Sequence, residues 1–340
     1  MEPTPLRTAA ALASCSLLVL LAPLLAPYLS PAPASAPSLS LTGALHPGPT
    51  ALEAALVRTW REAAARARAR LEAALASPPP LAPSPGSAFA DVLEAAPLQP
   101  FLSHFGSDSD VTGERAIAFA PQLRARRGGL IAYGAGIATD GRFEHSLASS
   151  LGCEVHGFDC TLSRVELAAA RARYNFTLHG VCVGAPGAIG GDYTRGQSGL
   201  RFLPLQRIRQ TLGHAAAPLD VLKMDIEGGE WALLESEVLA PGLRPQALPR
   251  QLLFELHTEG ANAAYVAPSL VQGKGRAQVA ALFLRLLDVG FHVVTKVVNP
   301  GDDKCADFVL VREAPSAEAE EGKGDAEGGR WGGAYSPWDE

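Results

Sequence analysis

Between residues 130 and 312, short continuous apolar runs alternate with stretches whose apolar residues recur three or four positions apart. A continuous run bounded by turn residues is typical of a strand buried on both faces, and the wider spacing is typical of a helix that buries one side. We therefore expect strands at residues 130–136, 153–159, 177–184, 219–225, 251–257, 291–298 and 305–312. Helices are expected at residues 143–151, 163–174, 230–239 and 276–289.

This order of elements predicts the α/β class, a mainly parallel sheet with helices on both faces. Only residues 299–304 separate the last two strands. A parallel crossover needs a dozen residues or more, so these strands should form an antiparallel hairpin. Five parallel strands followed by a hairpin resemble the seven-stranded Rossmann-like sheet of S-adenosylmethionine-dependent methyltransferases, and differ from the six parallel strands of nicotinamide-dependent enzymes.

Glycines and an acid follow the first two expected strands. Gly134, Ala135 and Gly136 form a turn where the backbone can approach a ligand closely. Asp159 ends the next strand, 23 residues after Gly136, where an acid can accept hydrogen bonds from ribose hydroxyls. Ligands of such sheets bind at the carboxyl ends of the strands, so these residues predict a nucleoside site. The alternatives are a purely structural turn and an Asp159 that caps the next helix.

The fourth strand ends in "DVLKMDIEGGEW", residues 220–231. Its carboxylates Asp225 and Glu227 are costly to bury unless a cation or a hydrogen-bond donor meets them. S-adenosyl-L-methionine carries a sulfonium and an ammonium group. Asp225 is suited to hold the ammonium or to help order water and substrate, which also makes it a candidate catalytic residue. We therefore include both acids in the cofactor-binding set. The alternative is that both only cap the helix that follows.

The same stretch resembles the K-x-D-x-E-G signature of FkbM-type methyltransferases. The segments "GCEVHGFDCT", "QLLFELHTEG" and "LLDVGFHVVTKVVNP" resemble those of a methyltransferase-like family that carries an FkbM-related domain behind a signal sequence or an anchor. The resemblance covers about residues 120–312. It implies an S-adenosylmethionine-dependent methyltransferase, and FkbM relatives mostly methylate hydroxyl oxygens.

Methyl transfer to an alcohol requires an aligned acceptor and a group that takes its proton. His257, at the end of the fifth strand, is the candidate base, with a purely structural histidine as the alternative. Glu255 in the same E-L-H sequence is a candidate for orienting the neighbours of His257, and we expect it on the other face of the strand. Asp225, Glu255 and His257 could instead bind a divalent metal that acidifies the hydroxyl. No local spacing requires a metal, and we predict none.

The chain begins with a distinctive apolar segment. No Lys, Arg, Asp or Glu occurs between Arg7 and Glu53, and residues 9–29 are long enough to span a bilayer as a helix. Ala34-Ser35-Ala36 also suits a signal-peptide cleavage site. Residues 1–36 are thus an uncleaved anchor of a single-pass type II protein or a cleaved signal peptide. Both options place the protein in the secretory pathway.

The rest of the chain divides by composition. Residues 37–86 are predicted to be a Pro/Ala-rich spacer with a stem helix, either solvated or self-associating. Residues 87–312 form the expected methyltransferase domain, and residues 313–340 an acidic, disordered tail. That tail has eight acidic and two basic residues, so residues 1–312 contain 27 acidic and 27 basic residues and have no net charge. A neutral body argues against nucleic acid as the main partner.

Four cysteines lie outside the apolar segment, at 153, 160, 182 and 305, without zinc-like spacing. One or two disulfides are possible in an oxidising compartment, and small buried residues are the alternative. Asn175-Phe176-Thr177 is a glycosylation sequon.

The leading hypothesis is an O-methyltransferase for a hydroxylated small molecule or a glycan. A catalytically inactive pseudo-methyltransferase that acts through its stem helix and tail is the second. A Golgi glycosyltransferase, suggested by the anchor-stem-domain layout and by Asp108-Ser109-Asp110, which spells D-x-D, is the third.

Overall fold

The computed structural model describes residues 51–76, 90–93, 95, 102–106, 116–124, 129–184 and 200–312. The segment 1–36, the D-x-D at residues 108–110 and the tail 313–340 lie outside these residues, so the predictions made for them stay predictions. Within the described ranges, no helix combines the length and the apolar character that a membrane span requires.

The secondary structure follows the predicted order closely. The strands are β1 (Leu102–His104), β2 (Ala116–Ala118), β3 (Leu130–Ala135), β4 (Cys153–Phe158), β5 (Thr177–His179), β6 (Cys182–Val183), β7 (Phe202–Leu203), β8 (Val221–Met224), β9 (Gln251–His257), β10 (Phe291–Val298) and β11 (Cys305–Arg312). The helices are α2 (Ala51–Ala76), α3 (Ala120–Arg124), α4 (Arg142–Leu151), α5 (Arg164–Arg173), α6 (Leu205–Thr211), α7 (Glu230–Leu233) with a π-helical turn (Leu234–Val238), α8 (Pro268–Val271) and α9 (Arg276–Asp288), with 3-10 turns at Ala90–Val92 and Pro245–Ala247.

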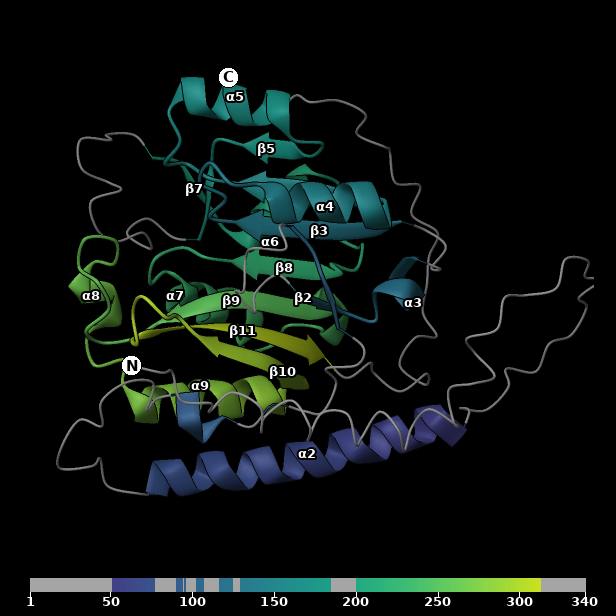
Figure 1. Ribbon diagram of the computed structural model, residues 1–340, viewed down its shortest axis with the longest axis vertical. Coiled ribbons are helices and arrows are strands. Elements are labelled where there is room, and N and C mark those ends of the chain that lie inside the picture. The colour runs from purple at the N-terminus through teal and green to yellow at the C-terminus, as the bar shows by residue number, and fades with distance from the viewer. Residues whose placement is uncertain are drawn as a thin grey trace, which may run out of the picture. The chain divides into compact units, whose positions relative to one another are not determined.

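Seven strands form one sheet in the order β10-β11-β9-β8-β3-β4-β5 (Figure 1). The strands β5, β4, β3, β8 and β9 are parallel, whereas β11 is antiparallel to both β9 and β10. The short connection before β11 forces that hairpin, as its length predicted. The fold class is therefore confirmed: a mostly parallel, seven-stranded Rossmann-like sheet with a C-terminal antiparallel hairpin.

The helices cover the sheet on two faces. On one face, Leu222 of β8 packs in a core with Ile208 of α6 and Phe283 of α9. On the other, Leu253 of β9 packs in a core with Leu147 of α4. Neighbouring residues of a strand point to opposite faces, so two covered faces require the continuous apolar runs seen in the sequence.

The predicted third strand is wrong in its extent, because the structure divides it in two. The strand β5 ends at His179 and pairs with β4, whereas β6 begins at Cys182 and pairs with β7 in a separate two-stranded sheet. A disulfide joins Cys182 to Cys160, in the loop after β4. One apolar run thus serves two sheets, and its pattern alone does not show where the division falls.

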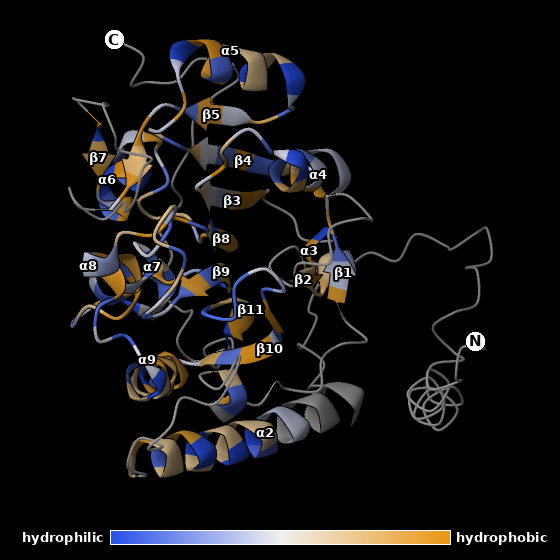
Figure 2. Cartoon of the chain, turned by 60° about the vertical axis from the view of Figure 1, so that its left-hand side comes forward, coloured by the Kyte–Doolittle hydropathy of each residue, from blue (hydrophilic) through white to orange (hydrophobic). Residues whose placement is uncertain are grey.

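The helix α2 packs against the rest of the domain instead of standing free. Ala63 and Leu71 are buried, and Arg68 forms an ion pair with Asp288 at the end of α9. The ring of Trp60 meets His292 of β10 edge-on, with centroids 4.7 Å apart. Figure 2 shows α2 running alongside this edge of the sheet.

The prediction of a solvated stem helix is therefore wrong for residues 59–76. The helix buries apolar side chains within the chain, so this face is not available for self-association. Self-association through the remaining surface of α2 stays a prediction.

Candidate functional site

A hollow with an empty volume of about 560 Å³, including its open mouth, lies at the carboxyl ends of the central strands. The turn after β3, the end of β4, β6 and the turn after β8 surround it. Its lining residues are Gly136, Ala138, Phe158, Asp159, Thr161, Cys182, Val183, Asp225, Ile226 and Glu227. This is the edge of an open α/β sheet at which ligands bind.

The structure brings together four of the predicted cofactor-binding residues, Gly136, Asp159, Asp225 and Glu227. Gly134 and Ala135 do not line the hollow. Gly136 has a φ of +76°, and a Cβ there would lie 1.7 Å from the carbonyl oxygen of Asp225. A Cβ on Gly134 would lie 2.6 Å from Oε1 of Glu144. Both positions therefore require glycine because a side chain would clash with these protein atoms, and not only because a ligand approaches the backbone.

The side chain of Asp159 organises the floor of the hollow. Its Oδ2 accepts a hydrogen bond from the Ala138 amide at 2.7 Å, and its Oδ1 accepts from the amide and the hydroxyl of Thr161 at 2.8 and 2.6 Å. The helix α5 is instead capped by Ser163 and Glu166, so the capping alternative for Asp159 is wrong. A carboxylate has about four acceptor sites, which leaves about one for a ligand hydroxyl.

The disulfide between Cys160 and Cys182 closes one side of the hollow. It ties the loop that carries Asp159 to β6. Of the remaining cysteines in the described ranges, Cys153 and Cys305 are free and buried. The structure therefore combines the two alternatives from the sequence, one disulfide and two small buried residues.

The turn after β8 is held by Glu230, which the sequence analysis did not single out. This fully buried side chain accepts hydrogen bonds from the amides of Ile226 at 2.7 Å and Gly228 at 2.9 Å. Glu227 has a φ of +55° in the same turn, a conformation that is unusual without a glycine. Asp225 takes no part in this capping, since its buried Oδ1 has no hydrogen-bond partner among the described residues.

His257 lies among three carboxylates. Its Nε2 is 3.3 Å from Glu227 Oε2 and 3.5 Å from Glu255 Oε2, and its Nδ1 is 3.4 Å from Glu230 Oε2. The expectation that Glu255 lies on the other face of β9 is wrong, because residues two apart on a strand share a face. Glu255 does neighbour His257, as predicted, and also accepts a hydrogen bond from Asn299.

This grouping changes the acid–base character of the site. Burial by itself lowers the pKa of His257, but the charge of Glu230 and a hydrogen bond with Cys305 raise it well above its usual range. Burial, with the charge of Asp225, raises the pKa of Glu227 to about 8. Burial also raises the pKa of Asp225 to about 6, against the opposing charge of Lys223.

A raised pKa favours the protonated form of His257, which counts against the role of base that its sequence position suggested and favours a role in positioning Glu227. The role of base stays a prediction. The metal alternative changes in its residues. Glu255 and His257 belong to a ligand-like group at this edge together with Cys305, and Asp225 is not part of that group.

The carboxylates that line the hollow fit a cationic nucleoside. Asp159 offers an acceptor to a hydroxyl. The carboxylate of Asp225 lines the hollow and brings a negative charge that suits an ammonium group, although its unpartnered Oδ1 is itself buried. A buried carboxylate without a partner is costly, and an adjacent cation offsets that cost.

Comparison with solved structures returns matches of low sequence identity. M. capricolum TrmK, solved with S-adenosyl-homocysteine, is 8% identical, with 58% of this chain and 68% of that chain covered and a TM-score of 0.29. A mutant of the 16S rRNA (adenine(1408)-N(1))-methyltransferase from Catenulisporales acidiphilia is 14% identical, with coverage of 63% and 99% and a TM-score of 0.28. The cyclopropane synthase MmaA2 from Mycobacterium tuberculosis is 11% identical, with coverage of 59% and 70% and a TM-score of 0.26.

Comparison with curated protein sequences returns no match. A family model described as "Methyltransferase domain" (Methyltransf_22) matches residues 59–312. The match covers the whole sheet and most of α2, and it supports the predicted cofactor, S-adenosyl-L-methionine. The chain belongs to this methyltransferase domain family.

Proposed function

We propose that this methyltransferase transfers a methyl group from S-adenosylmethionine to a hydroxyl oxygen of a small molecule or a glycan in the secretory pathway. The FkbM-type resemblance forms part of this proposal. The observation that carries it is the hollow itself, where the carboxylates of Asp225 and of the largely buried Asp159 meet at the carboxyl edge of the sheet.

Asp159 would accept a hydrogen bond from a ribose hydroxyl, and Asp225 would hold the ammonium group. The bound cofactor supplies an activated methyl group. The chain in turn orients the acceptor, excludes water and receives the acceptor proton.

Glu227 is the group best suited to receive that proton. It lines the hollow, and its pKa of about 8 gives its carboxylate a useful basicity near neutral pH. When bound, S-adenosylmethionine would supply a methyl group for the acceptor oxygen, with the electrons of the carbon–sulfur bond left on sulfur, and Glu227 would take the hydroxyl proton. The neighbouring imidazolium of His257, 3.3 Å away, positions the carboxylate.

Two features support the secretory location. The disulfide between Cys160 and Cys182 requires an oxidising compartment to persist. Asn175 of the sequon is exposed and thus accessible to a glycosylating enzyme. Expression in secreting cells, followed by glycosidase treatment and mass measurement with and without reductant, tests both features together.

Titration calorimetry tests the cofactor site. We expect the wild-type protein to bind S-adenosylmethionine with micromolar affinity and not to bind NAD. Asp159→Asn and Asp225→Asn should each weaken binding by about tenfold or more, since each removes a charge-assisted hydrogen bond. Asp303→Asn, in the β10–β11 connection, is the matched control and should bind normally. Equal binding by all four proteins would contradict the assignment.

Turnover separates the enzyme from a pseudo-methyltransferase. Methyl transfer from labelled cofactor to a library of hydroxylated metabolites and glycans supports an O-methyltransferase. Cofactor binding without transfer to any member of the library supports the inactive alternative.

A further inference from the structure

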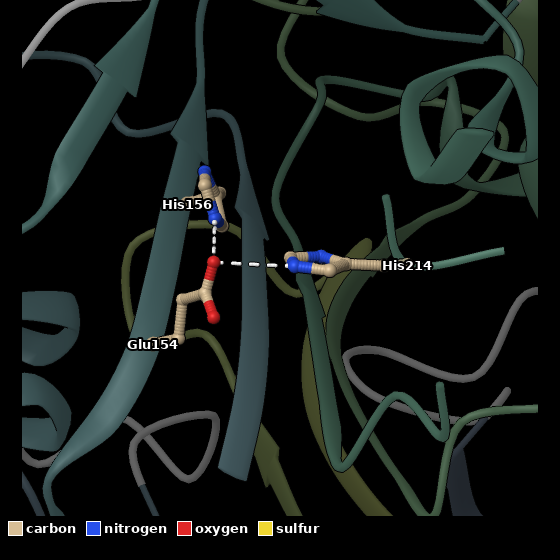
Figure 3. A group of neighbouring side chains, drawn as sticks. All are labelled: Glu154, His156 and His214. Atoms are coloured by element: carbon tan, nitrogen blue, oxygen red, sulfur yellow. Dashed lines mark hydrogen bonds and ion pairs between the residues drawn. The ribbon is translucent and has the colours of Figure 1, made fainter. Parts of the chain in front are cut away.

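A second group of titratable side chains lies on β4, before its carboxyl end. Glu154 and His156 belong to β4, and His214 follows α6. Nε2 of His156 and Nε2 of His214 lie 3.1 and 3.2 Å from the same atom, Oε1 of Glu154 (Figure 3). None of these three residues lines the hollow, although His156 stacks on Phe158, which does, with ring centroids 6.5 Å apart.

Two further side chains fix the orientation of the rings. Nδ1 of His156 is 2.9 Å from Nε2 of His179 on β5, and Nδ1 of His214 is 2.7 Å from the hydroxyl of Tyr133 on β3. Histidines that bind metals almost always use their second ring nitrogen for such a hydrogen bond, which sets the tautomer and aims the ligating nitrogen. Both rings are therefore aimed at one point from rigid parts of the sheet.

Burial differs across the group in a way that suits a metal ion. The side chains of His156 and His214 are only 4% and 10% exposed, whereas that of Glu154 is 41% exposed. The imidazoles are thus held in place by packing, and the carboxylate borders solvent. An ion placed between the three ligand atoms would have a route of entry and room for water.

We propose that Glu154, His156 and His214 form a binding site for a divalent transition-metal cation, with Zn²⁺ the first candidate. Two imidazole nitrogens and one carboxylate oxygen, all within 4.8 Å of one another, are a known zinc ligand set that leaves a position for water. With the ion bound, each neutral imidazole would carry its proton on Nδ1, where His179 and the Tyr133 oxygen accept it. Without the ion, an Nε2 proton of each ring faces Glu154, so binding shifts the tautomer of both rings.

The site would join β4 to the segment after α6. None of its ligands lines the cofactor hollow, so the ion would stabilise the fold and would not take part in methyl transfer. The other ligand-like group in the described ranges, Glu255, His257 and Cys305, differs in a measurable way because it contains sulfur.

Glu154→Gln is the sharpest variant. The glutamine oxygen still accepts hydrogen bonds from both imidazoles, so the network persists, but the anionic ligand is lost. We expect the metal-free wild-type protein to bind one Zn²⁺ per chain with a dissociation constant below about 1 μM, measured against a competing chelator. Glu154→Gln should weaken zinc binding by at least about tenfold. Tyr133→Phe removes the hydroxyl next to Nδ1 of His214 and should weaken zinc binding by about tenfold.

Glu255→Gln is the matched control, because it makes the same change in the sulfur-containing group. It should bind zinc as the wild type does. X-ray absorption of the zinc-loaded protein should show only nitrogen and oxygen neighbours at about 2.0–2.1 Å. Circular dichroism checks that each variant is folded, and His214→Gln replaces any that is not.

Four results would overturn the proposal: no bound zinc, undiminished binding by Glu154→Gln, loss of binding in Glu255→Gln, or a sulfur neighbour at about 2.3 Å.

Discussion

Replacement of Glu227 by glutamine should stabilise the protein and slow methyl transfer. Glu227 is held beside Asp225 and Glu230, largely out of solvent, and its pKa rises from 4.5 to about 8. Glutamine keeps the size of the side chain and its place in the turn but has no charge to bury. The variant therefore removes the cost of a buried acid while it also removes the proposed base.

The magnitude follows from the two pKa values. Between pH 4.5 and 8 the native state keeps a proton that the unfolded state has released, so the free energy of unfolding falls as pH rises through this window. At about 1.4 kcal/mol per unit, the cost is about 3 kcal/mol at pH 7 and about 1 kcal/mol at pH 5. The side chain is 24% exposed, and solvent screening reduces the gain at pH 7 to about 2 kcal/mol.

Urea denaturation followed by tryptophan fluorescence measures this difference at both pH values. Glu227→Gln should gain about 2 kcal/mol at pH 7 and less than about 1 kcal/mol at pH 5. Thermal unfolding at pH 7 should shift upward by about 4–8 °C. Methyl transfer, measured on the same preparation, should fall while S-adenosylmethionine still binds.

Glu259→Gln provides the matched control, because Glu259 is exposed in the loop after β9. Its stability should change by less than about 0.5 kcal/mol at either pH. A gain for Glu227→Gln that is equal at pH 5 and pH 7, or a loss of stability at pH 7, would refute the reasoning that burial of this acid sets its pKa.

Three other predictions concern the cofactor, the disulfide and α2. The pKa of Asp225 is raised to about 6, and only the ionised form holds an ammonium group. Affinity for S-adenosylmethionine should therefore rise by about tenfold between pH 5 and pH 7, and calorimetry should show a flat profile in Asp225→Asn. Replacement of Cys160 and Cys182 by serine should cost about 3 kcal/mol of stability and loosen the cofactor site, since the bridge closes a loop beside it; equal urea midpoints would contradict this. Leu71→Ala should destabilise by about 2–4 kcal/mol if α2 is docked as observed. Arg68→Ala, at an exposed ion pair, should cost less than about 1 kcal/mol, and a Leu71 variant as mild as this control would mean that α2 stands free.

Predictions that depended on chain length and local pattern were the successful ones. The antiparallel hairpin of β10 and β11 was predicted because six connecting residues allow no other connection. The division of residues 177–184 between β5 and β6 was not, because both strands are apolar and the choice depends on partners elsewhere in the chain. The packing of α2 was missed for the same reason, since helix propensity does not reveal what covers the apolar side.

Prediction of the site residues from the sequence was limited in the same way, with one exception. Asp225 and Glu227 were found because they end a central strand, but nothing local shows that Glu230 already satisfies the amides of that turn. The proximity of Glu255 to His257 was available from the period of two along β9, which places them on one face. The same period pairs Glu154 with His156 on β4, yet His214 joins them only through the folded course of the chain after α6.

The buried acids also explain why the proposed roles of His257 and Glu227 depend on each other. An isolated buried imidazole would lose its proton and an isolated buried carboxylate would keep one. Here three carboxylates surround a single imidazole, and their charge favours its protonated form. Glu227 borders the hollow, and the charge of His257 opposes the rise of its pKa to about 8. Removal of His257 should therefore raise the pKa of Glu227 further, and a His257→Gln enzyme should need a higher pH for half-maximal methyl transfer. A pH profile unchanged by that substitution would separate the two residues and leave Glu227 without its positioning partner.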